Sequence, residues 1–164
     1  MAGEFSVRAA VAEDGAQMAE ILNEIIAIGG TTARMDPATP QELVAEFLTG
    51  AEALGAVVAV TPEGFCVGFQ GLERDDTLPD NVGDISTYAR QVPRLRGVGT
   101  AMFAATRRRV GVMGLSEINA VIRADNVPGL AYYGKMGFVD VDRIIGRALP
   151  NGQIVDRIVR RFRL

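Results

Sequence analysis

The stretch Gln91-Val92-Pro93-Arg94-Leu95-Arg96-Gly97-Val98-Gly99-Thr100-Ala101-Met102-Phe103 decides the fold. It follows an extended run over 84–89 and opens a segment whose pattern predicts a helix over 98–110. Two glycines one residue apart permit a sharp turn that exposes consecutive N–H groups. The first amides of a helix lack internal partners and carry the positive end of its dipole, so such a turn suits a phosphate. With Arg94 and Arg96 beside it, we expect the turn to hold the pyrophosphate of a nucleotide-like cofactor.

Two common nucleotide motifs are excluded by the residues around this turn. A P-loop ends in Gly-Lys-Ser or Gly-Lys-Thr, and the sequence contains neither. A dinucleotide fingerprint needs a third glycine where Met102 stands. It also needs an acidic residue about 20 positions on within a parallel repeat, and Glu117 has that spacing only through composition. NAD-dependent redox chemistry is therefore disfavoured.

The pattern Arg94-x-x-Gly97-x-Gly99 instead resembles the acetyl-CoA signature of GNAT-type N-acetyltransferases. A second stretch, Asn126-Val127-Pro128-Gly129-Leu130-Ala131-Tyr132-Tyr133-Gly134-Lys135-Met136-Gly137-Phe138, resembles the other motif of that family. It has an Asn, a short helix carrying Ala and Tyr, and Lys-x-Gly-Phe opening a strand. The motifs stand in the family's order, and the resemblance covers nearly the whole chain. It implies acetyl-CoA as the co-substrate.

Composition sets broader limits on the function. The 164 residues predict one domain spanning 1–164, with 48% hydrophobic and 23% charged residues, as in ordinary globular proteins. A net charge of −3 and a pI near 5.0 argue against nucleic acid as a partner. The single cysteine, Cys66, excludes an intrachain disulfide and reads as a buried apolar residue. With no leader and no long apolar run, we expect a cytoplasmic protein without a membrane partner.

The hydrophobic pattern predicts eleven elements in the order β-α-α-β-β-β-α-β-α-β-β. This is an α+β fold with a mixed central sheet flanked by helices, and the order matches the GNAT acyltransferase fold. The expected strands span 4–9, 56–60, 65–71, 84–89, 117–122, 138–144 and 154–159, and the expected helices span 14–28, 39–49, 98–110 and 127–136.

A finer resemblance is to the phosphinothricin acetyltransferase branch of the family. It rests on Ile21-Leu22-Asn23-Glu24-Ile25-Ile26, Thr31-Thr32, Pro40-Gln41-Glu42-Leu43 and Asn151-Gly152-Gln153. The branch implies a homodimer and a small amine acceptor, an amino acid or an analogue. The loop 74–81 departs from the branch, because it is acidic and lacks the aromatic residues found there. The branch's acceptor is therefore not assigned to this chain. The acidic loop either favours a cationic acceptor or is a run of solvated surface charge.

The resemblance also implies which residues bind the cofactor. In the family, the strand before the glycine turn splays from its neighbour, and the pantetheine arm fits the wedge between them. Asn126 matches a residue that hydrogen-bonds this arm, although it is also a plausible helix N-cap. The strand positions are Thr87, Tyr88 and Ala89, and the pyrophosphate loop comprises Leu95, Arg96, Gly97, Val98, Gly99 and Thr100, with Arg94 beside it. No metal is implied.

Tyr133 matches the family's general acid, which protonates the departing CoA thiolate. Its neighbour Tyr132 faces about 100° away on the same helix and is expected to pack in the core. Lys135 lies either over the CoA phosphates or in solvent. One alternative is a non-catalytic acyl-CoA-binding module, but such a module would lose its acid–base groups. Another is acetylation of a peptide or protein amine.

Asp84 is the candidate base, because the branch keeps a glutamate at that position. The sequence has no histidine, so acid–base chemistry must use Asp, Glu, Tyr or water. Strand alternation places Ser86 on the same face, where it can hold a relaying water. Glu73 is the competing carboxylate, and Gly83-Asp84 is also ordinary turn chemistry.

Overall fold

The computed structural model describes residues 3–164. The main elements follow the predicted order. A short helical turn at Ala12–Asp14 is additional, and the helix predicted over 39–49 is divided into an α-helix over Pro40–Val44 and a wider helical turn over Ala45–Thr49. The helices are α1 (Gly15–Ile28), α2 (Pro40–Val44), α3 (Val98–Val112) and α4 (Val127–Met136). The strands are β1 (Ser6–Ala9), β2 (Ala53–Val60), β3 (Cys66–Glu73), β4 (Val82–Ala89), β5 (Glu117–Arg123), β6 (Val139–Ala148) and β7 (Ile154–Arg163).

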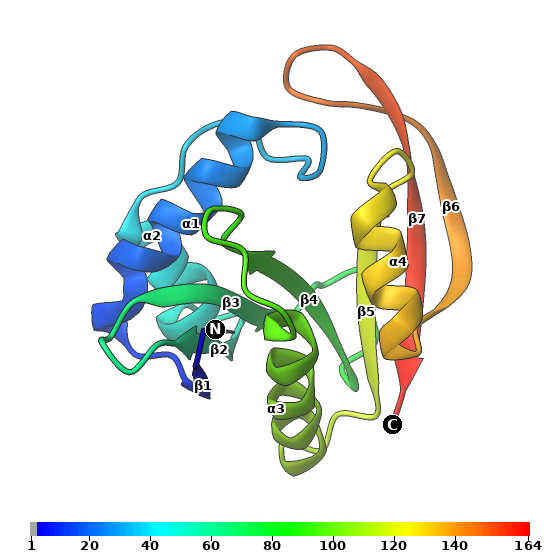
Figure 1. Cartoon of the computed structure of the whole chain (residues 1–164). Helices are drawn as coiled ribbons and strands as arrows, with labels where there is room; N and C mark the ends of the chain where they lie inside the picture. The colour runs from blue at the N-terminus through cyan, green and yellow to red at the C-terminus, as the bar shows by residue number, and fades with distance from the viewer. Residues whose placement is uncertain (1–2) are drawn as a thin grey trace.

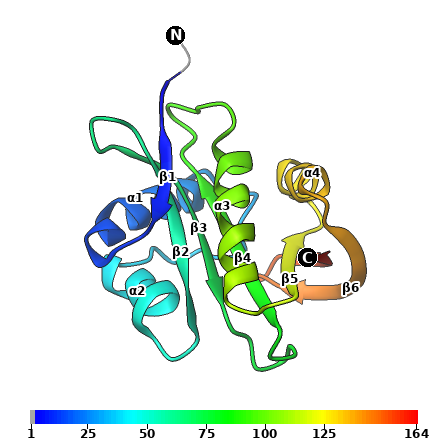
Figure 2. The same cartoon turned by 90° about the horizontal axis from the view of Figure 1, so that it is seen from below.

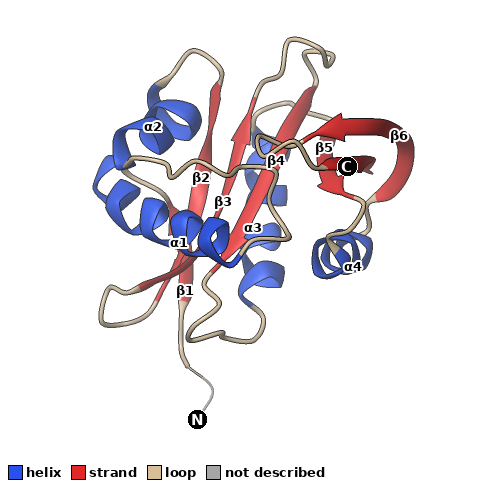
Figure 3. Ribbon diagram, turned by 90° about the horizontal axis from the view of Figure 1, so that it is seen from above, coloured by secondary structure: helices blue, strands red, loops and turns tan. Residues whose placement is uncertain are grey.

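All seven strands form one mixed sheet in the order β1-β2-β3-β4-β5-β7-β6, in which only the β4–β5 pair is parallel. Helices α1 and α2 cover one face of its first half, and α3 covers the other (Figures 1 and 2). Helix α4 lies beside β5 and β7 on the same side as α3 (Figure 3). The predicted α+β fold is confirmed.

Local sequence explains where the helices begin and which face each one buries. In α1, the stripe of Met18, Ile21, Leu22 and Ile25 is buried against β2 and β3, as its helical spacing predicts. The α2 start is capped by Thr39, whose Oγ1 accepts a hydrogen bond from the Glu42 amide at 3.1 Å. This cap and Pro40 in the first turn fix the start of the helix.

The last strand, β7, is longer than its sequence pattern predicts. The expected end was residue 159, but the strand continues to Arg163. Its arginines gave no apolar alternation, yet Arg161 and Arg163 both pair with Glu117 on the neighbouring strand β5. Pairing with β5 and β6, and not local pattern, sets this boundary.

The feature that positions the site is a break in the centre of the sheet. Strands β4 and β5 pair only at Val82↔Glu117, Gly83↔Ile118 and Asp84↔Asn119. Beyond this point β4 stays paired to β3 as far as Ala89, while β5 stays paired to β7 as far as Arg123. The two strands therefore diverge (Figure 1), and the backbone edge of β4 that faces β5 has no ladder partner over residues 85–89. The expected separation of the strand before the glycine turn from its neighbour is therefore present in the structure.

Candidate functional site

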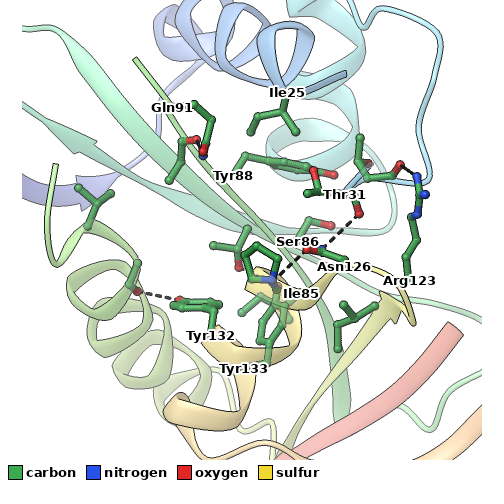
Figure 4. A pocket seen from close by; sticks show the side chains of 18 of the residues that line it. Ile25, Thr31, Ile85, Ser86, Tyr88, Gln91, Arg123, Asn126, Tyr132 and Tyr133 are labelled. Atoms are coloured by element: carbon green, nitrogen blue, oxygen red, sulfur yellow. Dashed lines mark hydrogen bonds between the residues drawn. The ribbon is translucent and has the colours of Figure 1, made fainter. Parts of the chain in front are cut away.

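A cavity of about 620 Å³ fills the wedge between β4 and β5. It extends from the glycine turn, past α4 and the end of β5, to the loop between α1 and α2 (Figure 4). The residues that line it include no aspartate or glutamate, although the chain as a whole carries a net charge of −3. The charged lining residues are Arg34, Arg94, Arg96, Arg123, Lys135 and Arg157. The cavity is therefore electrostatically suited to an anionic ligand.

The glycine turn has the geometry expected of an anion-binding loop. Gly97 has a φ of 80° and is the N-cap of α3, so it needs the left-handed region that favours glycine. Gly99 is required for a different reason, because a Cβ there would lie 2.6 Å from the Tyr132 ring. The predicted loop, Leu95 to Thr100, lines the cavity together with Arg94, and Arg94 and Arg96 are exposed.

The two adjacent tyrosines of α4 both line the cavity, which corrects the expectation that Tyr132 only packs in the core. The Tyr132 hydroxyl donates to the Gly99 carbonyl at 2.7 Å and accepts from Gln70 Nε2 at 3.0 Å. Tyr133 is buried, and its hydroxyl lies 2.8 Å from Thr87 Oγ1. Burial raises the pKa of Tyr132 to about 12 and raises that of Tyr133 further, so both phenols hold their protons at neutral pH.

Asn126 is the N-cap of α4, which confirms one of its two predicted roles. Its Oδ1 accepts from the Gly129 amide at 3.0 Å, and its Nδ2 donates to the Thr31 carbonyl at 3.2 Å. Close by, Arg123 Nη1 donates to the Thr32 carbonyl at 3.0 Å. These bonds tie the α1–α2 loop to the end of β5 across the mouth of the cavity (Figure 4). A contact between Asn126 and pantetheine stays a prediction.

Asp84 and Glu73 lie side by side on β4 and β3 but do not line the cavity. Burial raises the pKa of Asp84 to about 6, against the opposing effect of Asn119 Nδ2, which donates to Asp84 Oδ1 at 2.8 Å. Burial and the nearby Glu46 raise the pKa of Glu73 to about 7. Both carboxyls have pKa values near neutrality. Ser86 lies on the same face of β4 as Asp84 and does line the cavity, so Asp84 would act on a ligand there through Ser86 or a water.

The two faces of β4 present different chemistry to the cavity. Thr87 lies opposite Gln70 on the face covered by α3 and α4, together with Tyr133. Ser86 and Asp84 lie on the other face, toward α1 and α2. The candidate general acid, Tyr133, and the candidate base, Asp84, are therefore on opposite sides of the strand.

Arg157 is a lining residue that the sequence analysis missed. It lies on β7 directly opposite Arg123, an arrangement of like charges that costs stability. Arg123 is neutralised by Asp125 at 2.7 Å, whereas Arg157 has no ion-pair partner within residues 3–164. The Arg157 Nε is buried and makes no hydrogen bond within that range. Arg157 is one of several arginines in β7, and nothing in the sequence distinguishes it from the others.

The acidic loop lies away from the main cavity. It lines a separate cavity of about 240 Å³, and within the loop Thr77 Oγ1 donates to Asp75 Oδ1 at 2.6 Å. Residues 3–164 contain no cluster of three side chains suited to a metal ion. None of the helices in that range has the length and hydropathy needed to cross a lipid bilayer.

Comparisons with known proteins agree with this geometry, although no family model matches the chain. YwnH of Bacillus subtilis (strain 168), described provisionally as a phosphinothricin acetyltransferase, is 26% identical over 154 residues, covering 93% of this chain and 94% of that protein. A crystal structure described provisionally as a phosphinothricin N-acetyltransferase has a TM-score of 0.85 at 24% identity, covering 98% and 99%. A phosphinothricin acetyltransferase from Sinorhizobium meliloti, solved with acetyl-CoA, has a TM-score of 0.84 at 22% identity, covering 98% and 88%.

The two solved structures establish the fold, and the similarity to YwnH extends over nearly the full length of both chains. The glycine turn and the α4 motif occur in the family's order, on either side of a splayed strand pair. The chain therefore shares the fold of these acetyltransferase structures, and it is similar over nearly its whole length to a protein described as a phosphinothricin acetyltransferase.

Proposed function

We propose that the chain is an N-acetyltransferase that moves the acetyl group of acetyl-CoA to a primary amine of a small molecule. The observation that carries this proposal is the unpaired edge of β4, flanked by a helix N-terminus at Gly97 and by a buried phenol at Tyr133. A module that only bound acyl-CoA would have no use for a phenol held by hydrogen bonds inside the cavity.

The residues present fit acetyl-CoA. The amides at the start of α3, with Arg94 and Arg96, would hold the pyrophosphate, and Lys135 would add charge nearby. The free backbone edge of β4, from Thr87 to Ala89, would pair with the amides of the pantetheine arm. When bound, acetyl-CoA supplies a thioester carbonyl. The S. meliloti relative, solved with acetyl-CoA, supports this assignment.

The chain's own groups would then divide the chemistry. A neutral amine attacks the thioester carbonyl, and a C–N bond forms as the C–S bond breaks. A free β4 amide would stabilise the charge that develops on the carbonyl oxygen. Tyr133 would give a proton to the departing sulfur, and Asp84, through water and Ser86, would take one from the amine. Glu73 remains the competing base.

The acceptor is proposed to be an amino acid or a close analogue, because the Arg157 guanidinium has no ion-pair partner among the residues that the structure describes. Arg157 lies on the same face of the sheet as Asp84 and Asn119, the side from which the amine would approach. Guanidinium groups bind carboxylates through paired N–H bonds. The acidic loop lies elsewhere, so it does not support a cationic acceptor. The homodimer implied by the resemblance stays a prediction.

The cofactor assignment is tested by thermal shift. Acetyl-CoA at about 100 times its Kd should stabilise the fold by about 2.7 kcal/mol. For a chain of this size that raises Tm by about 5 to 10 °C. NAD and ATP at the same concentration should shift it far less, and equal shifts from all three would overturn the assignment.

The acceptor assignment is tested by a screen of amines with acetyl-CoA, covering amino acids, their decarboxylated counterparts, polyamines and peptide N-termini. Arg157→Gln should raise KM for a carboxylate-bearing acceptor by about 10-fold or more, the usual effect of losing a charged hydrogen bond. KM for the decarboxylated counterpart should not change. A loss of the same size for both amines would remove Arg157 from the acceptor site.

A further inference from the structure

Gln70 is a buried residue of β3 that no step of the proposed chemistry uses. Only 1% of it is exposed, and its Nε2 donates to Thr87 Oγ1 at 2.9 Å and to the Tyr132 hydroxyl at 3.0 Å. Its Oε1 is buried without a hydrogen-bond partner among residues 3–164. A buried amide oxygen without a hydrogen-bond partner lowers the stability of the fold, so we looked for a function that Gln70 could serve.

The chemistry of the neighbours decides which way the Gln70 amide faces. The Gly99 carbonyl can only accept, so the single hydrogen of the Tyr132 hydroxyl is committed to it at 2.7 Å. Tyr132 can then only accept from Gln70, which must present its NH₂ group. A flipped amide would place two acceptors face to face. The same NH₂ group donates its second hydrogen to Thr87, and Oε1 is left alone as a consequence.

This orientation acts on Tyr133 through Thr87. The Thr87 hydroxyl lies 2.8 Å from that of Tyr133 and accepts a hydrogen bond from Gln70 Nε2 at 2.9 Å, which leaves its own hydrogen available to donate. A hydroxyl that already accepts an N–H bond becomes a better donor, because hydrogen bonds in a chain polarise one another. With Thr87 donating to Tyr133, the phenol's own hydrogen is free to point into the cavity that Tyr133 lines.

We propose that Gln70 and Thr87 are positioning residues that hold the Tyr133 proton toward the cavity and support the phenolate left after it is given up. This proposal rests on the proposed acetyl transfer. Tyr133 is packed among apolar residues such as Phe138, so a phenolate there has Thr87 as its one hydrogen donor within residues 3–164. The direction of the chain, from Gln70 N–H to Thr87 O–H to Tyr133 O–H, is the direction in which the acid must work.

The first test needs no substrate. Neutron diffraction from deuterated protein without ligands should place the Thr87 deuterium between Thr87 Oγ1 and the Tyr133 hydroxyl oxygen. It should also show two deuterium atoms on the Gln70 side-chain atom that lies beside the Tyr132 hydroxyl, which identifies that atom as Nε2. A deuterium on Tyr133 directed at Thr87 would overturn the proposed direction, whatever the protein's activity.

The second test is a double-mutant cycle with an amine from the screen. Thr87→Val keeps the shape and removes the hydroxyl, and it should lower kcat by about 10-fold or more. Thr87→Ser keeps the hydroxyl and should stay within about threefold of the wild type. In a Tyr133→Phe background the two Thr87 variants should have equal kcat. A Thr87→Val loss that persists there would show that Thr87 does not act through Tyr133.

Gln70→Leu completes the cycle. It should lower kcat in the wild-type background and have little further effect on kcat in the Thr87→Val variant. A full additional loss would exclude Gln70 from this chain. If the wild type turned over no amine at all, the acetyl-transfer proposal would fail, while the neutron result would still decide the hydroxyl direction.

Discussion

The two faces of β4 differ in how their polar groups are connected to one another. On the α3–α4 face, Gln70, Thr87, Tyr132 and Tyr133 form a connected set of hydrogen bonds that ends on the Gly99 carbonyl. On the α1–α2 face, Asp84 and Glu73 have pKa values raised to about 6 and about 7 by burial, and Arg157 lacks a partner in residues 3–164.

This difference indicates what each face is for. A connected set of hydrogen bonds holds its members in place, which suits a bound cofactor and the candidate acid Tyr133. Partly buried charges without partners cost stability, and such groups gather where a ligand supplies the missing partner. We therefore assign the first face to acetyl-CoA and the second to the acceptor.

The sharpest test of the cofactor face is Tyr133→Phe. It should lower kcat by about 10²-fold or more, the low end for a lost general acid. The ring and its packing remain, so the affinity for acetyl-CoA, measured by calorimetry, should barely change. If kcat were unaffected, Tyr133 would be a packing residue and water would be the acid.

On the acceptor face, Asp84→Asn should lower kcat/KM by about 10²-fold at pH 7. Raising the pH should recover part of the loss, because free amine becomes more abundant. Wild-type activity should fall as the pH drops through about 6, the pKa of Asp84. Glu73→Gln is the matched control, and if it lost activity while Asp84→Asn did not, Glu73 would be the base.

The raised pKa values of Asp84 and Glu73 should also affect how the stability of the fold depends on pH. Each binds its proton more tightly in the folded chain than in the unfolded one, so their contribution to stability declines as pH rises from about 4 through about 7. At pH 8, Asp84→Asn should therefore have a higher Tm than the wild type, with the difference shrinking toward pH 4. A lower Tm at pH 8 would show that ionised Asp84 is stabilised by its surroundings.

The smallest expected effects separate the two glycines of the turn. Gly97→Ala meets open space but is strained at a φ of 80°, which costs about 1 to 2 kcal/mol. Gly99→Ala brings a Cβ to 2.6 Å from the Tyr132 ring and should displace that ring from its bond to the Gly99 carbonyl. Chemical denaturation should show that Tyr132→Leu partly rescues Gly99→Ala and leaves Gly97→Ala unchanged; equal rescue of both would contradict the assignment.

Local sequence determined the cofactor face of this protein. The glycine turn, the helix it opens, the capped start of α4 and the Tyr133 position are short-range features, because turns, caps and helix starts depend on residues within a few positions of each other. The order of the elements followed from the same local patterns, and with it the fold.

The sequence named Asp84, Ser86 and Glu73 as candidates on the acceptor face, but only the tertiary structure added Arg157 and set their surroundings. Arg157 lines the cavity and Asp84 does not, and both are positioned by pairing between strands that are far apart in the sequence. The length of β7 depends on the same pairing. The role of Tyr132 was also hidden, because its partners Gly99 and Gln70 come from two other elements. Burial and long-range contacts set pKa values and hydrogen-bond direction, and no local pattern carries them.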